Sequence, residues 1–222
     1  MPGWDLPSSE AALELAARHP GVIDAAVGIH PHDAAALDEP SFARLELLAA
    51  EPGVRAIGEI GLDFFRNLSP PDLQREVFQR QLALAAANGL PVLVHDRDAH
   101  HDITEILLAW AGRAGSRRPG VLHAFSGDAR MAERLSDGGF LISFALPVAF
   151  RSATGPRDAA AALDAGRFLV ETDSPYLGPD RDRRNEPSTA LRVAAELARV
   201  REIEVSELVA PIRAAYDSLV AR

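Results

Sequence analysis

Four residues of this sequence have the types and positions that a metal site requires: Glu59, His95, His123 and Asp173. Each lies in or directly after a short apolar segment, where an unpartnered polar group is costly to bury. Singly, each has a structural explanation, such as a hydrogen-bonded histidine or a glutamate paired with arginine. Together, two imidazoles and two carboxylates without sulfur suit a divalent ion such as Mg, Mn or Zn.

Two aspartates stand close to these candidate ligands in the sequence. Asp63 follows Glu59 by four positions, and Asp96 follows His95 directly. A carboxylate near a ligating histidine can orient its imidazole. Solvation at the surface explains both aspartates equally well.

Composition narrows the chemistry. The chain has 222 residues, no cysteine and no lysine, so all 23 basic residues are arginine. Disulfides, thiolate ligands, Schiff-base lysines and a carbamylated lysine between two metals are therefore excluded. The net charge of −9 argues against nonspecific adhesion to nucleic acid, so a nucleic-acid substrate would need local arginines or a metal.

Nothing in the pattern suggests a membrane span, a secretory signal or a second domain. No apolar run approaches the roughly 18 residues of a membrane helix, and the N-terminus lacks a basic region followed by an apolar stretch. We expect one soluble cytoplasmic domain over residues 1–222, with no membrane and no identified protein partner.

Short β-rich segments alternate with amphipathic ones along the chain, which predicts an α/β fold with a parallel sheet. The six predicted strands are 22–28, 54–59, 91–95, 120–125, 139–144 and 167–172. The predicted helices are 8–18, capped by its first serine, and 41–50, 70–88, 99–113, 128–137, 157–165, 188–199 and 206–220.

This alternation fits either an open doubly wound sheet or a closed barrel. A dinucleotide-binding sheet would place a GxGxxG loop after the first strand, but GIHPHD (28–33) stands there. The polar candidates gather near the carboxyl ends of predicted strands, which converge on one mouth in a barrel. The positions of the polar residues therefore favour the barrel.

At these residues the sequence resembles the TatD family of metal-dependent deoxyribonucleases, from about Asp5 to the C-terminus. Six ordered segments carry the resemblance: AAVGIHPHDA (25–34), AIGEIGLDFF (56–65), PVLVHDRDAHHD (91–102), VLHAFSG (121–127), FLVETDSPYL (168–177) and RNEP (184–187).

The resemblance implies a TIM-like (β/α) barrel with two divalent ions. By it, Glu59 bridges the ions, His95 and His123 hold one, and Asp173 holds the other and orients the water, which makes Glu59 and Asp173 the catalytic candidates. It also places His30 at the rim near substrate. The remaining substrate-binding candidates are Arg97 and Arg184, whose forked guanidinium suits phosphate oxygens or, equally, a neighbouring carboxylate.

The sequence departs from the family at its start. The family's first strand carries a His-x-His motif that completes the metal site, and the one H-x-H here, His30 to His32, matches a different segment. Six predicted strands stand where a barrel has eight. We therefore expect a barrel lacking its first two strands, through a late start codon or a trimmed chain rather than natural loss, with one ion bound poorly and hydrolysis weakened.

The function that the resemblance implies is metal-dependent cleavage of DNA phosphodiester bonds, working from strand ends. Two alternatives stay open. One is hydrolysis of another ester or amide by the same barrel, including removal of a D-amino acid from tRNA. The other is a degenerate barrel that binds metal or a partner without catalysis.

Overall fold

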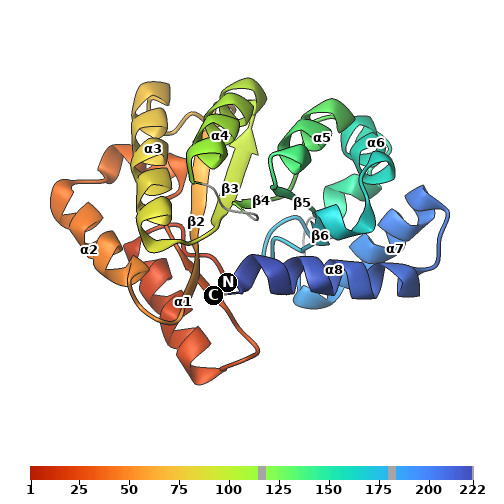
Figure 1. Cartoon of the computed structure of the whole chain (residues 1–222), viewed down its shortest axis with the longest axis horizontal. Coiled ribbons are helices and arrows are strands. Elements are labelled where there is room, and N and C mark those ends of the chain that lie inside the picture. The colour runs from red at the N-terminus through yellow and green to blue at the C-terminus, as the bar shows by residue number, and fades with distance from the viewer. Residues whose placement is uncertain (115–118, 180–183, 222) are drawn as a thin grey trace. The chain divides into compact units, whose positions relative to one another are not determined.

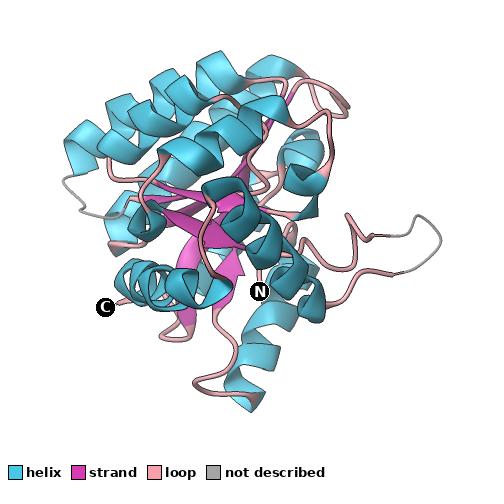
Figure 2. Ribbon diagram, turned by 90° about the vertical axis from the view of Figure 1, so that its right-hand side faces the viewer, coloured by secondary structure: helices cyan, strands magenta, loops and turns pink. Residues whose placement is uncertain are grey.

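The computed structural model describes residues 1–114, 119–179 and 184–221, and the chain divides into two compact units, Met1–Val121 and Leu122–Arg222. Six strands occur in the described residues and alternate with helices (Figure 1 and Figure 2). The α/β class is therefore confirmed. The expectation of a single barrel domain over residues 1–222 stays a prediction.

The first unit contains three parallel strands, because β1 pairs with β2 and β2 pairs with β3. Helix α1 packs against β1 and α3 packs against β2 (Figure 1). The strand β4 (Gly120–Leu122) spans the boundary between the units. The other elements are α1 (Leu6–Arg18), β1 (Ala25–Val27), the 3-10 helix η1 (Pro31–Ala36), α2 (Glu39–Ala49), β2 (Val54–Asp63), α3 (Pro71–Asn88), β3 (Val92–Arg97) and α4 (His100–Ala114).

The core of this unit is built from strands that carry apolar side chains on both faces of the sheet. Strands of parallel sheets are covered on both sides and therefore carry nearly continuous apolar runs. Fully buried strand side chains are Val27, Val54, Ile57, Ile60, Leu62, Val92 and Val94. Polar side chains among them consequently need partners, as described below for Glu59 and Asp63.

Several element ends in this unit differ from the prediction, and β2 ends at Asp63 rather than at residue 59. Helix α1 begins at Leu6, because Asp5 rather than Ser8 is its N-cap and accepts a hydrogen bond from the Ser8 N–H. Strand β1 begins at Ala25, because the N–H groups of Val22 and Ile23 donate to the His19 carbonyl in the turn that ends α1. The C-terminal end of α3 is as predicted, with Gly89 in the left-handed conformation.

An extended segment that the sequence did not predict lies beside β1 at residues 1–4. The Gly3 N–H donates to the Ala26 carbonyl at 2.9 Å, and the Ala26 N–H donates to the Met1 carbonyl at 3.0 Å. On its other side, the Gly3 carbonyl accepts the Glu59 N–H at 2.8 Å. This segment therefore fixes the backbone from which a candidate ligand projects.

The second unit contains the parallel pair of β5 and β6. Its aromatic core has Phe144 in edge contact with Phe125 and Phe168, at centroid distances of 6.2 and 5.8 Å. Its elements are α5 (Ala129–Asp137), β5 (Leu141–Phe144), η2 (Leu146–Ala149), α6 (Thr154–Ala162), η3 (Ala165–Arg167), β6 (Phe168–Val170), η4 (Pro187–Thr189), α7 (Ala190–Arg201) and α8 (Val205–Val220).

Several predicted ends in this unit are also shifted. Strand β4 ends at Leu122 rather than at residue 125, and Ala124 has a positive φ of 42° that a strand does not allow. Helix α6 lies three residues nearer the N-terminus than predicted, since Leu163 is already extended. No helix in the described part of the chain has both the length and the apolar character of a membrane span. The cytoplasmic location stays a prediction.

Candidate metal centre

Strands β2 and β3 bring His95 between two carboxylates. Side chains at alternate positions of a strand share a face, so Glu59 and Asp63 both project from one side of β2, and Gly61 between them pairs with His95 on β3. The Nδ1 atom of His95 lies 3.0 Å from Oε1 of Glu59, and its Nε2 atom lies 3.2 Å from Oδ2 of Asp63. Both ring nitrogens therefore face a carboxylate.

This arrangement suits a bound cation. A neutral imidazole carries one N–H, so it can donate to only one of two carboxylates. In a neutral His95 ring the other nitrogen would present a lone pair toward an oxygen, a contact that a second proton or a bound divalent ion would relieve. If an ion takes the nitrogen on the Glu59 side, the other N–H remains bonded to Asp63, which is the usual support for a metal-bound histidine.

Asp63 is the most deeply placed of these carboxylates, with 1% of its side chain exposed. Burial alone would raise its pKa, but hydrogen bonds from His95, the Arg66 N–H and His32 outweigh burial and hold the pKa well below its usual range. Its backbone is fixed by Gln74, whose Oε1 accepts the Asp63 N–H at 2.8 Å. Asp63 is therefore a rigid anion beside His95, which favours the first of the two alternatives that the sequence left open for it.

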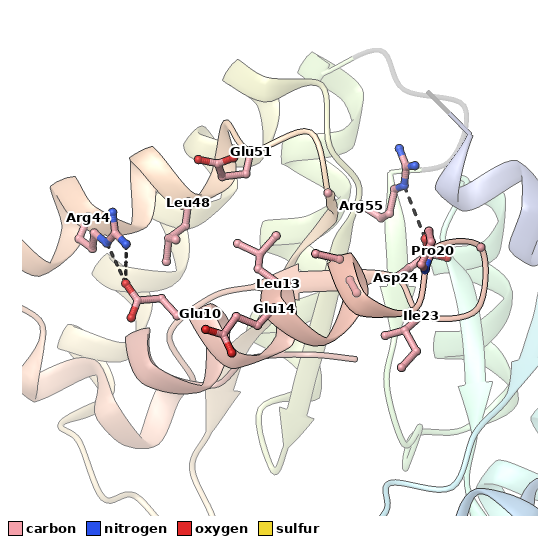
Figure 3. A pocket seen from close by; sticks show the side chains of 14 residues that line it. Glu10, Leu13, Glu14, Pro20, Ile23, Asp24, Arg44, Leu48, Glu51 and Arg55 are labelled. Atoms are coloured by element: carbon pink, nitrogen blue, oxygen red, sulfur yellow. Dashed lines mark hydrogen bonds and ion pairs between the residues drawn. The ribbon is translucent and has the colours of Figure 1, made fainter.

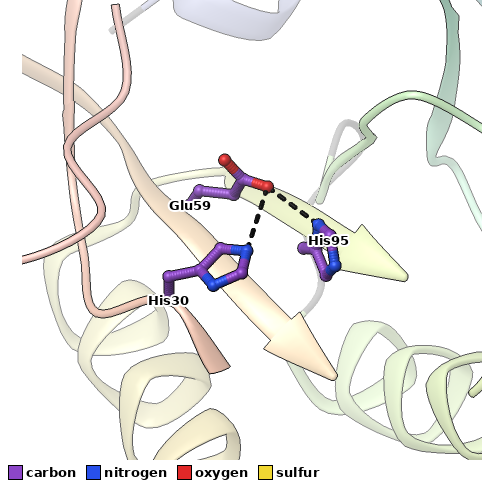
Figure 4. A group of neighbouring side chains, drawn as sticks. All are labelled: His30, Glu59 and His95. Carbon is purple, nitrogen blue, oxygen red and sulfur yellow. Dashed lines mark hydrogen bonds and ion pairs between the residues drawn. The ribbon is translucent and has the colours of Figure 1, made fainter. Parts of the chain in front are cut away.

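His30 lies in the same cluster, three residues after the end of β1 (Figure 4). Its Nε2 atom is 3.6 Å from Oε1 of Glu59, and His30, Glu59 and His95 could together offer three ligand atoms to one ion. However, its Nδ1 accepts the His32 N–H at 3.2 Å. Burial, followed by the nearby His95, lowers the pKa of His30 to about 3, so the ring is neutral and its hydrogen is on Nε2. His30 is thus arranged as a donor.

His32, which was not among the predicted site residues, also lies in this cluster. Its Nε2 atom lies 2.8 Å from Oδ2 of Asp63, the same oxygen that faces His95. Its ring also packs edge-on against His30, at a centroid distance of 4.2 Å. The H-x-H spacing was the available signal, but only the η1 turn brings both rings to the cluster.

The second unit holds another histidine between two carboxylates. The Nδ1 atom of His123 lies 2.9 Å from Oε1 of Glu171, and its Nε2 atom lies 3.5 Å from Oδ1 of Asp173. Glu171 also accepts the Ala124 N–H. Glu171 was not among the residues predicted from the sequence, although its position two residues before Asp173, after an apolar strand, could have indicated it.

The backbone at this second cluster is conformationally unusual. Asp173 and Ala124 both have positive φ values, 56° and 42°. Residues other than glycine rarely adopt this conformation, and where they do the surrounding structure must enforce it. Asp173 contacts His123, and Ala124 follows His123 in the sequence. The fold therefore maintains strained backbone conformations at the two predicted ligands of this unit.

The remaining predicted residues lie as follows. Arg97, the last residue of β3, is exposed, and its guanidinium lies over the Phe65 ring at 4.1 Å from the centroid. Arg184 is exposed before η4. Asp96, for which the sequence left support of a site imidazole and surface solvation equally open, lies 2.8 Å from Nδ1 of His100 on α4.

The structure therefore pairs Glu59 with His95 in the first unit and His123 with Asp173 in the second. The convergence of the two pairs on one centre, and the individual roles of these residues, stay predictions.

A cavity of about 710 Å³ lies elsewhere in the first unit (Figure 3). It is lined by α1, the loop after it, α2 and the start of β2, and none of the described residues in its lining is a histidine. Ion pairs of Arg44 with Glu10 and of Arg55 with Asp24 lie in its wall. The histidine clusters, rather than this cavity, carry the candidate chemistry.

Comparison with known proteins identifies the family of this chain. Residues 1–220 match the family described as TatD related DNase. The chain is 38% identical over 208 residues to the uncharacterized metal-dependent hydrolase YabD of Bacillus subtilis, covering 93% of this chain and 80% of YabD. It is 42% identical over 205 residues to the 3'-5' ssDNA/RNA exonuclease TatD of Cronobacter turicensis, covering 88% and 76%.

A solved structure shows the same fold. The TatD homolog YJJV of Escherichia coli superposes with a TM-score of 0.91 at 28% identity, covering 100% of this chain and 85% of YJJV. The predicted TIM-barrel type of α/β fold is thereby confirmed. The family match covers nearly the whole chain, and the relatives are 38% and 42% identical to it. The chain therefore belongs to the TatD related DNase family and is a metal-dependent hydrolase acting on ester bonds.

Proposed function

We propose that this chain is an exonuclease that hydrolyses phosphodiester bonds of single-stranded DNA in a reaction dependent on divalent metal. The observation that carries the proposal is that His95 and His123 each lie between two carboxylates. The exonuclease named above, to which the chain is 42% identical, supports single strands as substrates and attack from the 3′ end.

The proposed ligands are Glu59, His95, His123 and Asp173, and Glu59 would be the carboxylate that two ions share. Their nitrogen and oxygen donors suit Mg, Mn or Zn. When bound, such ions activate water as a nucleophile and stabilise negative charge on a phosphodiester. The carboxylates of Glu59 and Asp173 are the proposed catalytic groups, Asp173 as the acceptor that orients the attacking water.

Asp63 would support this site without contacting an ion. Its buried carboxylate holds the His95 ring in one orientation, so that the nitrogen facing Glu59 is directed to the ion. Glu171 would do the same for His123 through its contact at 2.9 Å. Fixing a ligand ring in advance reduces the ordering that binding would otherwise require.

Substrate contacts are proposed for His30, Arg97 and Arg184. The neutral His30 ring presents its Nε2–H toward Glu59, where it can donate to a phosphate oxygen. Arg97 and Arg184 are exposed and carry guanidinium forks that suit phosphate. They would supply the local positive charge that a chain of net charge −9 needs to bind a polyanion.

The test is degradation of a single-stranded oligonucleotide labelled at one end, with Mg, Mn or Zn added to chelator-treated protein. We expect release of mononucleotides from the 3′ end, and a loss of rate of about 10²-fold or more in Glu59→Gln. Glu51→Gln, an exposed glutamate in the wall of the cavity, is the matched control and should keep the wild-type rate.

Parallel assays separate the alternatives. Cleavage of a D-aminoacyl ester on tRNA, with the oligonucleotide left intact, would contradict the proposed nuclease activity. It would instead support hydrolysis of another ester by the same barrel. Stoichiometric metal without turnover of either substrate would support a noncatalytic metal-binding protein.

A further inference from the structure

The turn after β2 presents an aromatic ring to solvent beside the candidate metal centre. Phe65 is 60% exposed, only two residues after the buried Asp63. Its neighbour Phe64 is half-buried, with the Arg75 guanidinium 5.0 Å from its ring centroid. Of these adjacent aromatic residues, Phe65 is therefore the one with a ring available to a ligand.

One face of the Phe65 ring is already covered by a cation. The guanidinium of Arg97 lies 4.1 Å from the ring centroid. Arg97 ends β3 and Asp63 ends β2, and these two residues are partners in the parallel ladder. The Phe64 N–H also donates to the Arg97 carbonyl at 2.9 Å. The stacked pair is thus attached to the strand ends that carry the site.

The turn that holds Phe65 is fixed by hydrogen bonds to the same aspartate that faces His95. Oδ1 of Asp63 accepts the Arg66 N–H at 2.7 Å, while its Oδ2 faces His95. Gln74 then joins both ends of the turn, because its Nε2 donates to the carbonyls of Asp63 and Ser69. The exposed ring is therefore held in place before any ligand binds, which lowers the entropic cost of binding.

We infer that Phe65, backed by Arg97, is a stacking platform for an unpaired nucleobase of the substrate. This inference rests on the proposed function and adds a subsite to it. A base stacks on an aromatic face regardless of its identity, and a guanidinium on the opposite face strengthens the electrostatic attraction. Bases inside a duplex offer no free face, so this platform would favour single strands.

The contact of Arg80 with the Phe42 ring shows what a purely structural arginine–aromatic pair looks like in this chain. Arg80 lies 3.9 Å from the Phe42 ring centroid and is paired with Glu39. Phe42 is 8% exposed, so its ring has little surface left for a ligand. Phe65 differs from Phe42 because its ring is exposed and because its turn is hydrogen-bonded to Asp63 of the candidate site.

The kinetic test compares Phe65→Ala and Phe65→Trp on a single-stranded oligonucleotide. Loss of one base stack should raise KM roughly tenfold in Phe65→Ala, with kcat within about twofold, and Phe65→Trp should retain the wild-type KM. Leu68→Ala is the matched control, because Leu68 is 63% exposed on the same segment and has no aromatic face. Its KM should not change.

Abasic substrates distinguish base stacking from a structural effect. With the bases removed from the last four nucleotides at the 3′ end, wild type and Phe65→Ala should have the same KM. An equal loss on intact and abasic strands, or an unchanged KM on intact strands, would overturn the platform while leaving the nuclease in place.

A binding measurement keeps the inference testable without cleavage. An oligonucleotide with 2-aminopurine at its 3′ end is titrated into chelator-treated protein, where hydrolysis is off. We expect its fluorescence to be quenched by wild type and Phe65→Trp and not by Phe65→Ala. Equal quenching by all three proteins would overturn the inference. Absence of hydrolysis after metal is restored would instead overturn the proposed function.

Discussion

Asp63 and His95 are joined by a contact of 3.2 Å between Oδ2 and Nε2, made by a carboxylate with 1% of its side chain exposed. The same ring contacts Glu59 through Nδ1 at 3.0 Å. A buried anion on one side of an imidazole fixes the ring and increases its basicity toward a ligand on the other side.

Asp63→Asn should weaken binding of divalent metal by about 10- to 100-fold, because it keeps the shape of the side chain and removes its charge from His95. Calorimetric titration of chelator-treated protein with Mn²⁺ measures the change in Kd. Asp96→Asn is the control, since Asp96 pairs with His100, and it should bind metal as the wild type does. Equal affinities in all three proteins would contradict this role of Asp63.

Metal should stabilise the folded chain through Glu59. A ligand that binds only the native state adds about 2.7 kcal/mol at a hundredfold excess over its Kd. The melting temperature of the wild type should therefore rise with Mn²⁺ concentration, and that of Glu59→Gln should rise much less. Glu51→Gln should follow the wild type. If Glu59→Gln gains as much as the wild type, Glu59 is not a ligand.

Gly61→Ala should unfold more easily and lose metal binding. Gly61 has a φ of 143°, and a Cβ there would lie 2.0 Å from the His95 carbonyl oxygen. The clash and the unfavourable φ should together cost about 2 kcal/mol or more. Gly112 lies on α4, and a Cβ there would meet no atom within 4 Å. Gly112→Ala should therefore raise the free energy of unfolding by about 0.5–1 kcal/mol. Urea unfolding of both variants checks the contrast.

The stability of metal-free protein should fall in acid through His30. Burial lowers the pKa of His30 from 6.5 to about 3 in the folded chain, so the unfolded chain binds the proton first. This contribution to stability is complete above pH 6.5 and is lost as the pH falls toward 3.

His30→Gln removes that titrating group. Its free energy of unfolding, measured with urea in chelator between pH 7.5 and 4, should therefore depend less on pH than that of the wild type. Identical slopes would show that His30 does not titrate with folding.

Local sequence patterns were sufficient for the secondary structure but not for every element end. The alternation of apolar strands and amphipathic helices predicted six strands, and six are present among the described residues. Val22 has a strand-like sequence, yet it is 82% exposed in the turn that ends α1. The extended segment at residues 1–4 depends on hydrogen bonds to Ala26 and Glu59, which are distant in sequence.

The sequence by itself determined the kinds of chemistry available and the strand ends that carry them, because side-chain type and apolar spacing are local properties. Tertiary structure alone decided the partners: two carboxylates around each of His95 and His123, and His30 as a donor rather than a free ligand. It likewise decided that Arg97 backs the exposed ring of Phe65. These contacts depend on strand register and on turns closed by distant side chains, and neither can be read from spacing along one chain.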